Sequence, residues 1–335
     1  MKHSLHPSEI ASLCLAVGML LLALWLHLLP ALLAGLLVYE LVHVLAPLLR
    51  RRLSDERSRL VAVVILASLI VGAVTAAVVG AVAFFRSDSG SLPMLLQKMA
   101  DIIDGARYAL PEWINEALPG DADALREALA HWLRTHAQEL RLAGTEAGRA
   151  FAHILIGMVI GAIISLRETA PARAQFPLAH ALSERTARLG LAFRCVVFAQ
   201  VRIAALNALF TGIYLALVLP ALGIHLPLTK TLIAVTFLFG LLPIVGNLLS
   251  NAAIVIVSLA ASPQIALASL VYLVVIHKLE YFFNAKIIGS RIDAHAWELL
   301  LAMVAMEAAF GLPGVVAAPI YYAYVKYELK ARGLV

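Results

Sequence analysis

The chain has 335 residues, of which 62% are hydrophobic and only 14% are charged. Soluble domains have about 45–50% apolar and about 25% charged residues, so this composition excludes a water-soluble globule and predicts an integral membrane protein. The net charge of +5 does not indicate nucleic-acid binding, because the basic residues flank apolar runs instead of sharing a soluble face with aromatic residues.

Five transmembrane helices are predicted in the first two thirds of the chain, at residues 10–29, 31–49, 60–85, 151–166 and 195–219. The first of these lacks the small-residue cleavage site of a signal peptide and is long enough to span a bilayer, so we interpret it as a membrane helix. Arg50, Arg51 and Arg52 follow the second. Because cytoplasmic loops are rich in Lys and Arg, this loop and the N-terminus are expected in the cytoplasm.

A more polar segment, residues 86–149, separates the third and fourth predicted helices. It carries ten acidic residues against seven basic ones, which favours the side of the membrane away from the cytoplasm. Apolar residues recur at helical spacing over residues 92–110 and 125–140. We expect amphipathic helices that lie on the membrane or against partner subunits; helices that pack only on their own domain are the alternative.

Four further apolar segments follow, at residues 231–242, 248–261, 265–283 and 297–325. The last is broken within residues 311–314, and basic residues after it indicate a cytoplasmic C-terminus. Two cytoplasmic termini require an even number of crossings, so the nine segments predict about eight crossings, with one or two segments forming re-entrant hairpins. The expected fold is an all-α membrane protein of three parts: helices in residues 1–85, an amphipathic segment in 86–149 and a transport core in 150–335.

No motif for enzyme chemistry is found in the sequence. It has no Gly-rich phosphate loop, no His-Glu-x-x-His helix and no Gly-x-Ser-x-Gly elbow. The two cysteines, Cys14 and Cys195, lack metal-ligand spacing. We therefore predict no ATP-driven pump, no enzyme, no cofactor and no metal.

Polar residues inside the apolar segments are the candidate residues of a substrate or ion path, since such groups are costly in hydrocarbon. They are Gln200 and Asn207 with Thr211, Asn247 and Asn251, His277, Glu280 and Asn284, and Glu307 with Glu298. A structural pairing of Glu280 with Lys278, Lys286 or Arg202 is the alternative to a path. Asn247 and Asn251 are equally compatible with hydrogen bonds that hold helices together. Glu40 and His43 could serve a relay, but a contact between helices or between subunits is favoured for them.

Helix-breaking residues are the second candidate feature. Non-helical backbone at membrane depth is tolerated only inside protein or beside water, and transporters build central sites from such broken helices. The predicted breaks and hinges are Pro243 and Gly246, then Gly311, Pro313, Gly314 and Pro319. These features predict a secondary transporter.

The chain resembles the autoinducer-2 exporter family of bacterial inner-membrane transporters over residues 193–325. The motifs of that family are matched in order by Gln200, Pro243 and Gly246, Glu280 and Gly289, His295, and Gly311, Gly314 and Pro319. The matches depart from the family pattern where Pro is common, at Asn247, near Lys286 and at Ala296, and these departures bear on the substrate more than on the fold.

The resemblance implies an eight-span fold, a hinge at Gly289, transport without ATP hydrolysis and assembly into a homo-oligomer in the inner membrane. It suggests a small polar solute such as autoinducer-2 as substrate, or exchange of sodium or lithium for protons. The expected partners are the bilayer, the solute or cation and further copies of the chain, with no nucleic acid. Two other hypotheses stay open: a non-transporting scaffold that acts through residues 86–149, and an intramembrane enzyme.

Overall fold

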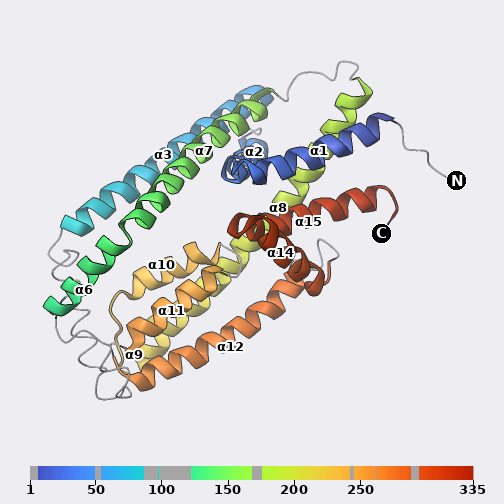
Figure 1. The fold of residues 1–335 in the computed structure, drawn as a ribbon. Coiled ribbons are helices and arrows are strands. Elements are labelled where there is room, and N and C mark those ends of the chain that lie inside the picture. The colour runs from blue at the N-terminus through green and yellow to red at the C-terminus, as the bar shows by residue number, and fades with distance from the viewer. Residues whose placement is uncertain are drawn as a thin grey trace. The chain divides into compact units, whose positions relative to one another are not determined.

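The computed structural model describes residues 7–49, 54–86, 97, 122–167, 176–241, 245–259, 261–287 and 294–334. All regular structure in these ranges is helical (Figure 1). Contacts divide the chain into two units. Unit 1 contains Met1–Val74, Leu142–Val197 and Gly289–Val335, and unit 2 contains Thr75–Arg141 and Phe198–Ile288.

Unit 1 is built from the two ends of the chain and a central part. It holds α1 (Pro7–Trp25), α2 (Leu29–Leu49), most of α3 (Asp55–Arg86), most of α7 (Ala137–Arg167), the start of α8 (Pro177–Ile213), α14 (Ala296–Phe310) and α15 (Leu312–Ala331). Pro30 lies in the first turn of α2, where its missing N–H is not needed. The turn between α1 and α2 places His27 at a φ of 56°.

Small residues allow α2 and α7 to pack closely in unit 1. A Cβ atom at Gly157 would overlap the backbone of Ala31, and one at Gly161 would overlap the backbone of Gly35. Two glycines four residues apart therefore face an Ala and a Gly four residues apart, the small-residue pattern by which membrane helices approach each other. The adjoining apolar core is centred on Val42.

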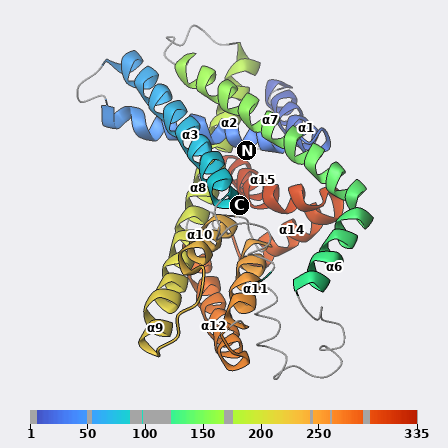
Figure 2. The same ribbon diagram turned by 90° about the vertical axis from the view of Figure 1, so that its left-hand side faces the viewer.

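Unit 2 contains the second half of α8, which continues through a five-residue π-helix, η1 (Tyr214–Val218), into α9 (Leu219–Ala221). Next come α10 (Thr229–Gly240), α11 (Val245–Leu259) and α12 (Pro263–Ile287), which lie side by side (Figures 1 and 2). The unit also includes α6 (Ala122–Thr135). The fully buried Ile254 lies within the apolar core, among Tyr214, Leu215 and Leu273.

The predicted all-α membrane fold is confirmed. Among the described residues, four helices are long and apolar enough to cross a membrane: α1, α2, α7 and the 45-residue helix Pro177–Ala221. The helices α10 and α11, at 12 and 15 residues, are about 18 and 22 Å long, less than the hydrocarbon thickness of about 30 Å. This length is suitable for a re-entrant hairpin, and which segments re-enter stays a prediction.

Several predicted boundaries are moved by the structure. The fourth and fifth predicted helices begin earlier than expected, at Ala137 and Pro177, because the polar residues that precede each apolar run continue the same helix. Of the two amphipathic stretches, residues 125–140 fall in α6 and the start of α7. Residues 92–110 lie outside the described residues, apart from Gln97. The three-part domain division stays a prediction.

Candidate functional site

The break between α10 and α11 forms one end of the site. A Cβ atom at Gly246 would overlap the carbonyl oxygen of Phe239, so only glycine lets the first turn of α11 fold back against the end of α10. Gly240, the last residue of α10, packs against Ala204 of α8. Pro243 lies outside the described residues. The two helix ends that flank the break are therefore packed tightly together, and the end of α10 lies against the middle of α8.

Polar side chains join α8 to this hairpin. Gln200 Nε2 donates to the carbonyl oxygen of Gly240 at 2.8 Å, and Asn207 Nδ2 donates to Asn247 Oδ1 at 3.0 Å. Asn207 is buried, with 7% of its surface exposed. The structure thus brings together three predicted path residues on facing helices, in what we call the amide seam (Gln200, Asn207, Thr211, Asn247 and Asn251).

The seam continues one helical turn beyond the asparagine pair. Asn207 and Asn247 are 40 residues apart, and so are Tyr214 of η1 and Ile254 of α11, which belong to one core. We infer from these two pairs that α8 and α11 run in the same direction in a constant register. This register brings Thr211 and the half-buried Asn251 to the same level. The hydroxyl of Thr211 is buried and has no hydrogen-bond partner among the described residues, so the seam contains an unused polar atom.

The polar stripe predicted on α12 is described only at its start. His277 is half-buried on α12. Glu280 and Asn284 belong to the same helix, but their side chains lie outside what the structure describes. The choice between a path and an ion pair for Glu280 therefore stays a prediction.

The second predicted break lies in unit 1, where α14 and α15 form an antiparallel hairpin. Gly311 separates them at a φ of 66° and ψ of −149°, a conformation that is essentially limited to glycine. Pro313 lies in the first turn of α15. A Cβ atom at Gly314 would overlap the carbonyl oxygen of Met306. Pro319 lies inside α15, and Gly289 is outside the described residues.

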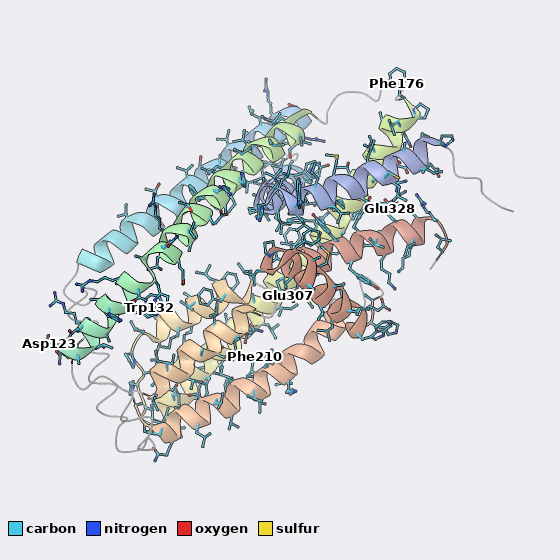
Figure 3. All side chains as sticks on the ribbon, in the orientation of Figure 1. Asp123, Trp132, Phe176, Phe210, Glu307 and Glu328 are labelled. Atoms are coloured by element: carbon cyan, nitrogen blue, oxygen red, sulfur yellow. The ribbon has the colours of Figure 1, made fainter. Side chains whose placement is uncertain are left out.

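Ionisable residues at the open end of this hairpin show that residues 297–325 fold back on themselves. Glu298, near the start of α14, accepts hydrogen bonds from Tyr322 and from Lys326, the latter at 3.2 Å, and His295 Nδ1 lies 3.0 Å from its second oxygen. Glu307 is also on α14 (Figure 3), where it is exposed. It belongs to unit 1 and the amide seam to unit 2.

Sequence reasoning missed a buried ion cluster in unit 1. Arg185 Nη1 donates to Glu328 Oε2 at 2.5 Å, and both residues are 5% exposed. Arg185 also donates to Ser12 Oγ at 2.7 Å and to the carbonyl oxygen of Glu9 at 3.0 Å, and Arg188 donates to both oxygens of Glu328. The cluster ties α1, α8 and α15 together; Glu328 is labelled in Figure 3.

A signal for this cluster is present in the sequence. Glu328 follows Tyr321 and Tyr324 at spacings of seven and four, and all three lie on the buried face of α15. The basic residues near Glu328 indicate a cytoplasmic C-terminus, and this interpretation does not reveal that Glu328 is paired. Glu40 is another buried carboxylate, packed against Gly190 and 3.8 Å from Arg194 Nε. It joins α2 to α8 within one chain, as the helix-contact alternative predicts.

The amide seam contains only uncharged polar side chains. Amides and a hydroxyl offer both donors and acceptors, so they can exchange bonds to each other for bonds to a polar solute without a change of charge. No group of three or more His, Cys, Asp or Glu residues able to hold a metal ion occurs in the described part of the chain.

A family model described as AI-2E family transporter matches residues 10–331. No curated protein and no solved structure matches the chain.

Proposed function

Because the chain belongs to the AI-2E transporter family, we propose that it is a secondary transporter that moves a small polar solute by alternating access, without ATP hydrolysis. The observation that carries this proposal is the bond between Asn207 and Asn247. It lies in the first turn of a helix that is too short to cross the bilayer, where transporters place their sites.

The amide seam provides the polar surface that a moving hairpin needs. Gln200 satisfies the carbonyl oxygen of Gly240, which the end of α10 leaves without an intrahelical partner. Asn207 and Asn247 satisfy each other when the path is empty. A solute with hydroxyl or carbonyl groups replaces this bond and reaches the hydroxyl of Thr211. Asn251, His277, Glu280 and Asn284 extend the path within unit 2. Glu307, on α14 of unit 1, stays a separate predicted path residue.

The proposed setting is the bacterial inner membrane, with both termini in the cytoplasm and several copies in each assembly. The Arg-rich loop after α2 supports this orientation. We propose that the protein transports its substrate without chemical change, as expected for a member of a transporter family.

The test is flux through the purified protein in proteoliposomes, with and without a proton gradient, using autoinducer-2 and sodium as probes. Asn207→Leu and Glu280→Gln should abolish flux while the protein stays monodisperse in detergent. Gln138→Leu is the matched control, because Gln138 is exposed near the start of α7 and outside the seam. Wild-type flux from Asn207→Leu would exclude the seam as the path.

Exchange of sodium or lithium for protons is the second candidate. It is favoured by the pair of Glu298 and Lys326, whose side chains are only 15% and 14% exposed, since a small cation can compete with an ammonium group for one carboxylate. Sodium-driven proton release that is lost in Glu298→Gln, with no autoinducer-2 flux, would select this function over the first.

A further inference from the structure

An open groove of about 760 Å³ lies on unit 2, between η1, α9 and the residues just after α9 on one side and the first half of α12 on the other. Leu219, Leu222 and Ile224 line one side, and Leu267, Val271 and Val275 line the other. Gln264 supplies the only amide side chain of the lining. An occupant of this groove is therefore held by apolar contacts along nearly its whole length.

The polar atoms of the groove wall are already satisfied inside the protein. The rings of Tyr214 and Tyr272 stack with centroids 4.1 Å apart. The Tyr214 hydroxyl lies 2.9 Å from Ser269 Oγ, and Tyr272 donates to the carbonyl oxygen of Phe210 at 2.9 Å. Only ring carbons remain to face the groove. The wall also contains the start of η1, and π-helical turns are frequent at functional sites.

The length and the ends of the groove fit one leaflet of a bilayer. Its lining on α12 extends from Gln264 to Val275, which is about 16 Å of helix at 1.5 Å per residue and about half of a hydrocarbon layer roughly 30 Å thick. One end meets residues 222–228, the loop between α9 and α10, and the other lies deep on α12. His225 of this loop and Lys230, in the first turn of α10, are both exposed.

We propose that this groove binds one acyl chain of a membrane phospholipid, whose phosphate lies at the 222–228 loop beside His225 and Lys230. The apolar wall, the length of one leaflet and the cationic end all match that single ligand. Three apolar side chains of the lining are also largely exposed, which is unfavourable in water: Leu222, Leu267 and Val271 have 69%, 62% and 56% of their surface accessible.

The bound acyl chain stabilises the part of α8 that also carries residues of the amide seam. Phe210, whose carbonyl Tyr272 holds, directly precedes Thr211 (Figure 3 labels Phe210). The lipid site is independent of the transported substrate, and it stands even if the amide seam carries no solute.

Photolabelling of the wild-type protein tests the proposal. The protein is placed in nanodiscs of phosphatidylethanolamine and phosphatidylglycerol that contain a phosphatidylglycerol with a diazirine midway along one acyl chain. Peptides covering residues 214–224 and 263–275 should be labelled about fivefold more than the exposed apolar face of α7. This ratio corresponds to a preference of the acyl chain for the groove of roughly 1 kcal/mol. Even labelling of all apolar helices would overturn the proposal, as would cross-links that show a second copy of the chain in the groove.

A groove-filling variant gives the second readout. Ala268→Phe places a ring in the groove and should reduce labelling there by about fivefold, whereas Ala252→Phe, on an exposed position of α11 outside the groove, should leave it unchanged. Unchanged labelling in folded Ala268→Phe would overturn the proposal. If that variant fails to fold, the wild-type labelling map still decides.

Discussion

Thr211 and Thr236 are equally buried, at 1% exposure each, but they differ in hydrogen bonding. Thr236 Oγ1 donates to the carbonyl oxygen of Leu232 in its own helix at 2.8 Å. The hydroxyl of Thr211 has no partner in the part of the chain that the structure describes. A buried polar group without a partner costs about 1–3 kcal/mol, so this one destabilises the seam unless a solute or water uses it.

We expect Thr211→Val to lower transport while the free energy of unfolding stays constant or rises by about 1 kcal/mol, because the substitution removes an unsatisfied group. Thr236→Val is the control and should lower the unfolding free energy by about 0.6 kcal/mol, the average for a hydrogen bond in a membrane protein, without an effect on flux. Denaturant unfolding in detergent and proteoliposome flux measure the two quantities. A larger loss of stability in Thr211→Val than in Thr236→Val would contradict this account.

The buried pair of Arg185 and Glu328 should respond strongly to single substitutions. Glu328→Ala leaves Arg185 buried without its carboxylate, which we expect to lower the free energy of unfolding by about 3–5 kcal/mol. The double variant Arg185→Met with Glu328→Leu should recover most of this loss, because no fully buried charge is left unpaired and Arg188 keeps its bond to Glu184. Thermal unfolding in detergent measures both changes.

Glu184→Ala is the matched control for this pair. Glu184 also bonds to Arg188, at 3.1 Å, but its side chain is 51% exposed, and the change should stay within about 0.5 kcal/mol. An equal effect of Glu184→Ala and Glu328→Ala would mean that burial does not set the strength of these ion pairs.

At the scale of single residues, the sequence predicted which side chains belong to the seam, because an amide within an apolar helix can be recognised without any structure. Gln200, Asn207 and Asn247 were all found in that way, although their roles stay predictions. Glu328 was missed, because near a helix end a charged residue resembles an ordinary solvated one. Its burial depends on α1 and α8, which are distant in the sequence.

Helix packing provides the prediction at the scale of elements. Gly161→Ala places a methyl group on the backbone of Gly35, so α2 and α7 must separate, and we expect a loss of about 1–3 kcal/mol in unfolding free energy. Gly144→Ala on the same helix meets no atom within 4 Å and should raise it by up to about 1 kcal/mol, since alanine favours helix. Thermal unfolding of both variants measures the sign of the change in unfolding free energy. Equal effects would refute close packing at Gly161.

The position of each apolar helix was predictable from composition, but helix length was not. The start of α8 at Pro177 lies 18 residues before the apolar run at Cys195, because arginines with partners such as Glu328 and Glu40 extend a helix as well as apolar residues do. The hairpin of α14 and α15 was recognisable as a break at Gly311. The contact of Glu298 with Tyr322 and Lys326 was needed to show that the segment folds back.

At the scale of the whole molecule, two re-entrant hairpins would leave six crossings, by α1, α2, α3, α7, α8 and α12. This number is even, as two cytoplasmic termini require, but it is lower than the eight crossings that the sequence predicts. A re-entrant hairpin returns to the side from which it entered, so we expect α12 to be the one crossing between the 222–228 loop and the C-terminus. Residue 225 and residue 334 are therefore expected on opposite sides. The sequence left this open, because nine apolar segments are compatible with several sets of crossings.

Cysteine labelling tests this topology in a chain whose Cys14 and Cys195 are replaced by Ala. In intact spheroplasts, an impermeant maleimide should label His225→Cys, whereas Leu334→Cys should react only after the membrane is permeabilised. If α14 and α15 instead crossed the bilayer as one broken helix, Leu334→Cys would be labelled from outside. The fold-back contacts of Glu298 predict the first result, because they bring the start of α14 and the end of α15 to the same depth.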